Sequence, residues 1–282
     1  MSQGNYVARP TDPGIVPLSV VGSALTDVGA VRTSNEDSVT VVVPDAMRQL
    51  REKGVLAVVA DGMGGHEGGE VASGIAVKRV AECYYKDSGD PQQALLRAFE
   101  AANKEIYEQA RKHSKLIGMG TTCTAVAVVN GMAYSAHVGD SRVYLIRGQQ
   151  IYCMTEDHSA TMEMVKKGML TLAEARNQEE RNVILRAMGT RPELEVALWT
   201  TPFPLRIDDR LLLCSDGLYE KLEDSELVSV SASRPPSEAC RELIRLAIER
   251  VSSDNVSAVI LHLCGAEGST AIKATREVSV QQ

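Results

Sequence analysis

Four aspartates at predicted strand ends are the residues of this sequence whose type and setting could support chemistry. Each stands beside a glycine or an asparagine, and they are Asp61, Asp140, Asp216 and Asp254. Asp61 follows the Val-rich apolar run 55–60, which predicts a buried strand. One such pair alone is an ordinary turn signal. Four of them at strand boundaries indicate a shared carboxylate site.

The glycines after Asp61 complete none of three well-known motifs. The dinucleotide fingerprint needs a glycine where Glu67 stands, and the segment lacks the Gly-Lys-Ser/Thr ending of a P-loop. The stretch 66–70 lacks the second histidine of a zinc-protease helix. Ser141 and Ser215 have no evident base and no Gly-x-Ser-x-Gly elbow occurs, which disfavours a serine nucleophile.

Carboxylates that crowd together repel one another unless protons or cations compensate them. If the strand after Asp254 runs against those that end at Asp61 and Asp216, all three side chains can reach one rim of the sheet. Oxygen ligands alone favour Mg²⁺ or Mn²⁺ over zinc, which prefers His and Cys. Two such ions could activate a water, and Arg32 could grip a phosphate. The set therefore predicts a phosphate-ester hydrolase.

Composition limits the class of protein. The chain has 282 residues, 44% of them hydrophobic, which is enough for one large domain or two small ones. The formal net charge of -7 argues against a nucleic-acid partner. No stretch approaches the ~18 apolar residues of a membrane-spanning helix, and we expect a cytoplasmic protein without a membrane partner. The six cysteines show no metal-ligand spacing and are interpreted as reduced core residues.

Hydrophobic periodicity predicts strands at both ends of the chain and long helices in pairs. The predicted strands cover 18–28, 39–43, 55–60, 122–129, 132–138, 142–146, 150–154, 195–199, 210–214 and 256–263. The predicted helices cover 69–85, 91–113, 225–229 and 236–251. We interpret 122–154 as one antiparallel meander. Paired helices favour an α+β fold with mainly antiparallel sheets over a doubly wound parallel sheet.

One folded domain accounts for most of the chain. We expect a flexible leader over 1–17, a domain over 18–264 and a polar, disordered tail over 265–282. Inside the domain, the charged stretch from about 160 to 185 contains short helical pieces and predicts a mobile inserted lobe.

Seven short motifs, in this order along the chain, resemble those of the bacterial-type protein phosphatase 2C family. They are Arg32 with Asn35-Glu36-Asp37-Ser38, Asp61-Gly62-Met63-Gly64-Gly65-His66, Gly118-Met119-Gly120-Thr121-Thr122, Val138-Gly139-Asp140-Ser141-Arg142, Asp157-His158-Ser159, Ser215-Asp216-Gly217 and Asp254-Asn255-Val256-Ser257. The resemblance spans about residues 18 to 263. It implies a four-layer α/β/β/α sandwich of two mainly antiparallel sheets flanked by helices.

The resemblance also implies a centre of two Mn²⁺ or Mg²⁺ ions with a third beside it. Asp61 would bridge the two ions, and the Gly62 carbonyl would bind one of them. Asp216 and Asp254 would complete the other ion, and Asp140 with Asp216 would hold the third.

Three more residues and one segment receive roles from the resemblance. Glu36 and Asp37 match acidic positions that bind metal-bound waters, and Arg32 matches the phosphate-gripping arginine. The segment of about 160–185 matches the flap beside the active site, a place for substrate selection.

One position departs from the family pattern. Many eukaryotic members have a histidine directly after the Asp-Gly pair, proposed as the general acid, and this chain has Met63 there. We expect the leaving-group proton from a water, with His66 as a second candidate. His66, His137 and His158 are also possible metal ligands, although isolated histidines more often bond locally.

We therefore expect a protein serine/threonine phosphatase that uses direct attack by a two-metal-activated water. Its partners would be phosphorylated proteins and a cognate Ser/Thr kinase, and we expect a monomer. Two alternatives remain open. One is a phosphatase for small phosphoesters or phosphotyrosine, and the other is a non-catalytic, metal-stabilised phosphoprotein-binding regulator.

Overall fold

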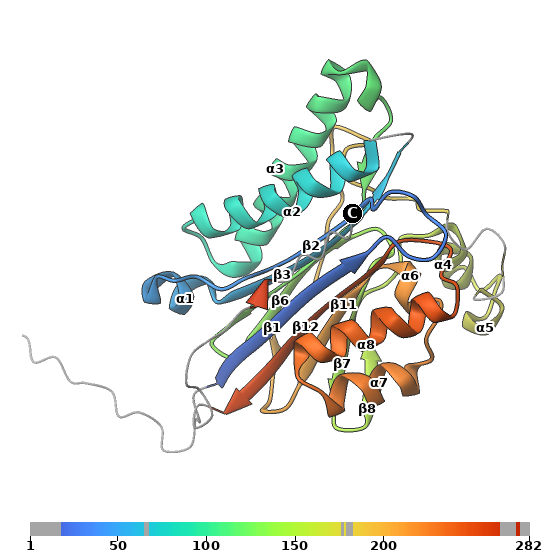
Figure 1. Cartoon of the computed structure of the whole chain (residues 1–282). Helices are drawn as coiled ribbons and strands as arrows, with labels where there is room; N and C mark the ends of the chain where they lie inside the picture. The colour runs from blue at the N-terminus through green and yellow to red at the C-terminus, as the bar shows by residue number, and fades with distance from the viewer. Residues whose placement is uncertain (1–17, 65–67, 176–177, 179–182, 266–274, 277–282) are drawn as a thin grey trace, which may run out of the picture.

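Two β-sheets packed face to face form the centre of the molecule, and helices cover both outer faces (Figure 1). The computed structural model describes residues 18–64, 68–175, 178, 183–265 and 275–276. The first sheet contains, in strand order, β13 (Thr275–Arg276), β1 (Leu18–Asp27), β12 (Val256–Gly265), β11 (Arg210–Cys214), β7 (Arg142–Arg147) and β8 (Gln150–Cys153). The second contains β10 (Phe203–Pro204), β6 (Met132–Val138), β5 (Cys123–Val129), β3 (Val55–Met63) and β2 (Asp37–Val42), with β4 (Gly120–Thr121) beside β3 and β9 (Ala197–Leu198) beside β6.

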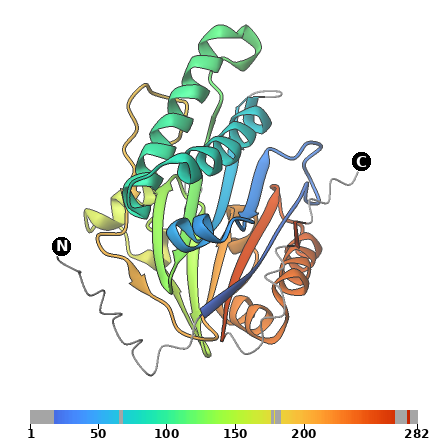
Figure 2. The ribbon, with the colours of Figure 1, turned by 90° about the vertical axis from the view of Figure 1, so that its left-hand side faces the viewer.

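Helices α2 (Gly68–Lys86) and α3 (Pro91–Lys112) cover the second sheet, and α7 (Asp224–Ser233) and α8 (Pro236–Glu249) cover the first (Figures 1 and 2). The shorter helices are α1 (Met47–Lys53), η1 (Ser114–Leu116), α4 (Ala160–Lys166), α5 (Leu172–Ala175) and α6 (Asp216–Tyr219). The expected four-layer sandwich of mainly antiparallel sheets is confirmed, since β1 with β13 is the one parallel pair among the described strands.

Residues 55–60 of strand β3 are all apolar because both faces of the strand are buried there. Its odd-numbered residues, such as Ala57 and Val59, pack into the core between the sheets, whereas Leu56, Val58 and Ala60 pack under the helices. Side chains of a strand alternate between faces. The uninterrupted run in the sequence is therefore the signature of a strand between two hydrophobic layers.

Helix α3 begins where its capping residues predict. The Asp90 side chain accepts hydrogen bonds from the backbone N–H groups of Gln92 and Gln93, each at 3.1 Å. Pro91 occupies the first helical position, where a missing N–H costs nothing.

The predicted meander over 122–154 is wrong. Strands β5 and β6 pair in the second sheet, but β7 and β8 pair in the first, so the turn at Gly139 crosses between the sheets. Gly139 has φ of +110°, and a Cβ there would lie 2.6 Å from the side chain of Thr122. A hairpin turn and a crossover between sheets use similar turn residues, so only the packing of the two sheets distinguishes one from the other.

Other expectations meet mixed outcomes. Helix α1 was not predicted. The cysteines were expected in the core, and three of the six free cysteines lie there, whereas Cys153 is exposed. The leader 1–17 lies outside the described residues. The described residues of the tail are Gly265, at the end of β12, and the short strand β13. No helix in the described parts of the chain combines the length and apolar character needed to cross a membrane.

Candidate active site

Strand alternation places acidic side chains between the two sheets, at one end of the sandwich. Asp37 lies directly opposite Asp61 in the antiparallel register of β2 and β3, so both share one face. From the other sheet, the hydroxyl groups of Ser215 and Ser257 lie 2.8 and 2.6 Å from the same oxygen of Asp37. Asp37 therefore ties the two sheets together at this end.

Two threonines fix the backbone of Asp61. The Asp61 N–H donates to Thr122 Oγ1 at 2.9 Å, and the Asp61 carbonyl accepts from the Thr122 N–H at 2.8 Å and from Thr121 Oγ1 at 2.9 Å. Thr122 Oγ1 also lies 2.8 Å from the hydroxyl of Ser141. These bonds hold the end of β3 against the crossover that carries Asp140.

Gly62 stands where two other backbone segments converge. Its N–H donates to the Glu36 carbonyl at 3.1 Å, and a Cβ on Gly62 would lie 2.1 Å from the carbonyl oxygen of Gly69. A Cβ on Gly69 would in turn lie 2.7 Å from the Glu36 carboxyl carbon. Glu36 thus sits at the first turn of α2, where the helix dipole favours a negative charge.

Burial and mutual repulsion raise the pKa of the carboxyl groups at this end. The pKa of Asp61 lies well above its usual range, first through burial and then through the charges of Asp37, Asp216, Asp140 and Asp254. Burial and the charges of Asp140 and Asp254 likewise raise the pKa of Asp216. Burial raises the pKa of Asp140 to about 7 and that of Asp37 to about 6. The structure therefore brings together the four aspartates selected from the sequence.

Two of these carboxylates have an oxygen atom without a partner in the protein. Oδ1 of Asp140 and Oδ1 of Asp216 are buried and accept no hydrogen bond. Such atoms are costly unless a cation or a water meets them. No group of three or more His, Cys, Asp or Glu side chains in the described regions is already arranged around a metal position. The oxygen-only donors fit Mn²⁺ or Mg²⁺ chemically, and side-chain rotation would have to complete the coordination.

Arg32 lies beside Asp254 in this structure. Its Nη2 donates to Asp254 Oδ2 at 2.8 Å, and its Nε donates to the carbonyl of Ser253 at 3.3 Å. The Arg32 side chain is nevertheless 50% exposed. The guanidinium therefore stands at the rim of the carboxylate cluster with part of its donor set open to solvent.

The histidines do not join the carboxylate cluster where the structure describes them, and His66 lies outside the described residues. The rings of His137 and His158 lie 4.8 Å apart. Nδ1 of His137 lies 2.8 Å from Thr124 Oγ1, and Nδ1 of His158 accepts from the Gly139 N–H at 3.1 Å. Burial lowers the pKa of His137 to about 4 and that of His158 to about 3. Both bond locally, as the expectation for isolated histidines has it.

His158 also attaches the predicted flap to the site. Its N–H donates to the Gly139 carbonyl at 2.7 Å, and its carbonyl accepts from the Leu185 N–H at 2.7 Å. Both ends of the segment 160–185 therefore meet at His158, which bonds to the crossover turn that carries Asp140.

Sequence reasoning assigns no role to Arg142 and Asp157, although both lie in the quoted motifs. Arg142 donates two hydrogen bonds to Asp157, at 2.9 and 2.7 Å, and its guanidinium lies 3.8 Å from the ring centroid of Tyr219. Tyr219 ends the short helix that begins at Asp216. The sequence offered one indication of this pair. Arg142 and Asp157 carry opposite charges on either side of the β7–β8 hairpin, and a hairpin brings its flanking residues together.

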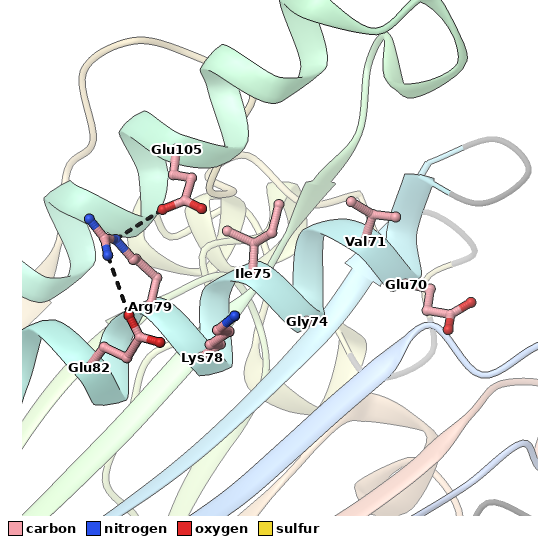
Figure 3. Close-up of a pocket in the computed structure, with 8 residues that line it drawn as sticks. All are labelled: Glu70, Val71, Gly74, Ile75, Lys78, Arg79, Glu82 and Glu105. Atoms are coloured by element: carbon pink, nitrogen blue, oxygen red, sulfur yellow. Dashed lines mark hydrogen bonds and ion pairs between the residues drawn. The ribbon is translucent and has the colours of Figure 1, made fainter.

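A hollow of about 700 Å³ lies along α2 on the side that faces α3 (Figure 3). It is lined by Glu70, Val71, Gly74, Ile75, Lys78, Arg79, Glu82 and Glu105. Arg79 joins the helices across it, with Nε 2.9 Å from Glu105 Oε2 and Nη1 3.4 Å from Glu82 Oε2 (Figure 3). None of the predicted site residues lines this hollow, so its shape does not mark the carboxylate site.

Comparison with known proteins identifies the family of this chain. Residues 32–243 match the family model described as protein phosphatase 2C. The chain is 33% identical to the serine/threonine phosphatase stp of Listeria innocua over 242 residues, which are 84% of this chain and 93% of that protein. It is 33% identical to the protein phosphatase PhpP of Streptococcus pneumoniae over 246 residues, 86% of this chain and 96% of that protein.

A solved structure shows the same fold. The catalytic domain of the serine threonine protein phosphatase PstP, in complex with two manganese ions, is 34% identical with a TM-score of 0.75. The match covers 88% of this chain and 99% of that domain. The chain therefore belongs to the protein phosphatase 2C family and is an enzyme of the protein serine/threonine phosphatase class.

Proposed function

We propose that this chain hydrolyses phosphoserine and phosphothreonine in proteins with two divalent cations bound at the Asp61 end of the sandwich. The observation that carries the proposal is the gathering of Asp37, Asp61, Asp140 and Asp216 at one end of the sandwich, buried or half-buried, with unpartnered oxygen atoms on two of them. Their burial and mutual charges raise the pKa of Asp61 and Asp216. A protein keeps such repulsive groups together when a ligand of opposite charge compensates them. Manganese in the related PstP domain supports this choice of ligand.

The residues that would hold the cations come from both sheets. Asp61 and the Gly62 carbonyl would serve one ion, and Asp216 and Asp254 would complete the other. The unpartnered Oδ1 atoms of Asp140 and Asp216 support a third site. Divalent cations, when bound, lower the pKa of water and offset charge on the phosphate.

Glu36 and Asp37 would orient water around the ions. Asp37 has one oxygen held by two serine hydroxyls, which leaves the other oxygen for such a water. The Glu36 carboxyl group lies beside Gly69 in the first turn of α2.

Arg32 would bind the phosphate group with its exposed guanidinium. To do so it would share or give up its hydrogen bond to Asp254. Met63 has no proton to give to the leaving oxygen. We therefore propose that a water protonates the leaving oxygen, with His66 as the second candidate for this role.

The location, oligomeric state and partner of the chain are proposed from the sequence alone. We propose that the chain acts as a monomer in the cytoplasm and opposes a Ser/Thr kinase, and that Mg²⁺ can replace Mn²⁺.

The test is phosphatase turnover by the purified chain on phosphothreonine and phosphotyrosine peptides, with Mn²⁺, with Mg²⁺ and with excess chelator. We expect Mn²⁺-dependent turnover of the phosphothreonine peptide, and a loss of more than about a hundredfold in Asp61→Asn and Asp216→Asn. Asp45→Asn is the matched control, because Asp45 is exposed. Full activity in excess chelator, or in Asp61→Asn, would refute the proposal. Equal turnover of both peptides would favour a broader phosphoester substrate.

A further inference from the structure

Asn255 uses both the donor and the acceptor atoms of its side-chain amide to hold residues 28–36, the loop that carries Arg32. The side chain is buried, and its Nδ2 donates to the carbonyls of Val28 and Ser34, each at 2.9 Å. Its Oδ1 accepts from the Glu36 N–H at 2.8 Å. An amide has two donor hydrogens, so both are committed here. The two ends of the loop are fixed to one buried side chain.

The same loop also packs closely against Asp254. Gly29 has φ of +80°, and a Cβ there would lie 2.3 Å from the Asp254 carbonyl oxygen. The Asn255 N–H donates to Asp254 Oδ1 at 2.8 Å, while Arg32 binds Asp254 Oδ2. Asn255 therefore links the segment of a predicted metal ligand to the loop of the predicted phosphate-binding arginine.

We propose that Asn255 is a positioning residue that sets where Arg32 meets the phosphate group. The inference rests on the proposed function, in which Arg32 binds that phosphate. Asn255 touches no substrate and acts through the three hydrogen bonds to the loop. Because a small displacement of a binding group can cost about a hundredfold in rate, loss of the amide weakens phosphate recognition even with Arg32 present.

Asn103 provides a matched control within the same fold. This buried residue of α3 donates through Nδ2 to the carbonyls of Arg191 and Pro192, at 3.0 and 3.1 Å. Its Oδ1 accepts from the Gly189 N–H at 2.8 Å. Asn103 thus makes the same three-bond clamp on a loop that does not carry Arg32.

The experiment is a double-mutant cycle on the full chain with Mn²⁺ and a phosphothreonine peptide. It compares Asn255→Ala, Arg32→Ala and the double variant, and measures kcat, KM and the inhibition constant of inorganic phosphate. We expect Asn255→Ala to raise KM and the phosphate inhibition constant by about tenfold to a hundredfold. In the Arg32→Ala background the same substitution should leave both values within about twofold, because coupled residues are not additive.

Hydrogen exchange gives a second readout that does not depend on activity. We expect the backbone amides of residues 29–36 to exchange faster in Asn255→Ala but not in Asn103→Ala. Asn255→Asp covers the case in which the alanine variant fails to fold, because it keeps the acceptor for Glu36 and loses both donors. It should show the same rise in KM and the same faster exchange.

Three results would overturn the inference. One is an equal effect of Asn255→Ala with and without Arg32, and another is unchanged exchange of residues 29–36 in the Asn255 variants. The third is an equal rise in KM for Asn103→Ala, which would indicate general destabilisation. An unmodified chain that is inactive with Mn²⁺ would instead refute the proposed function, and this inference with it.

Discussion

Removing the charge of Asp140 should change the stability of the metal-free protein in opposite directions at low and high pH. In the folded protein burial raises the pKa of Asp140 from 3.8 to about 7. The folded state then binds more protons than the unfolded state between these values, so stability falls as the pH rises. The penalty is absent below about pH 4 and complete above about pH 7.

The magnitude follows from the size of the pKa change. A rise from 3.8 to about 7 corresponds to about 4 kcal/mol, at about 1.4 kcal/mol for each pKa unit. Asp140→Asn removes this penalty but buries an amide where Oδ1 already lacks a partner, at a cost of about 1–3 kcal/mol at every pH. The variant should therefore be less stable than the unmodified protein by about 1–3 kcal/mol at pH 4 and more stable by about the same amount at pH 8.

The assay is urea unfolding in excess chelator at pH values from 4 to 8, which gives the free energy of unfolding for each protein. Asp87→Asn is the control for a carboxyl group whose pKa is lowered, and its loss of stability should be the same from pH 4 to pH 8. The hydrogen bonds from Arg97 lower the pKa of Asp87 to about 2, so the stabilisation by Asp87 is present above about pH 4 and is lost toward about pH 2. An Asp140→Asn difference that is the same at pH 4 and pH 8 would refute the argument from burial and repulsion.

Of three further predictions, two concern residues beside the site and one concerns Arg210, at the other end of β11. Gly62→Ala should destabilise the protein by about 3 kcal/mol in urea unfolding, because its Cβ would lie 2.1 Å from a backbone oxygen. The control is Gly74→Ala, which should stabilise the protein by about 0.5–1 kcal/mol, because the space around its Cβ is open. Arg142→Lys should lower stability by about 1–3 kcal/mol, since lysine cannot reproduce the two-pronged bond to Asp157, and no loss of unfolding free energy would contradict this. Arg210→Met should lower the melting temperature, because the Arg210 guanidinium binds carbonyl groups at the end of α7, and an unchanged melting temperature would show that the methionine replaces these contacts without loss.

Periodic patterns predicted the long elements well. The ends of the helices predicted over 69–85 and 91–113 lie within one residue of the ends of α2 and α3, because their apolar positions repeat at helical spacing over many residues. Helix α1 was missed, since a short polar segment has no such pattern and is held by contacts with the rest of the fold.

The assignment of strands to sheets was not available from local patterns. The turn at Gly139 resembles a hairpin turn in composition, yet it carries the chain from one sheet to the other. The difference depends on which hydrophobic faces meet across the sandwich, and that is a property of the whole domain.

The sequence by itself determined which chemistry we predict for the site. Acidic residues beside glycine or asparagine at strand ends, with Arg32 upstream, predict oxygen donors for a metal and a cationic side chain for a phosphate group. These residue types can be read directly from the sequence, without a structure.

Only the tertiary structure decided how these residues are held. The opposition of Asp37 and Asp61, the serine bridge between the sheets and the clamp by Asn255 join residues up to 227 positions apart. Such contacts depend on register and packing, where a slip of one residue would turn each side chain to the opposite face. The sequence therefore predicts which groups form the site, and the packing of the two sheets determines the distances between them.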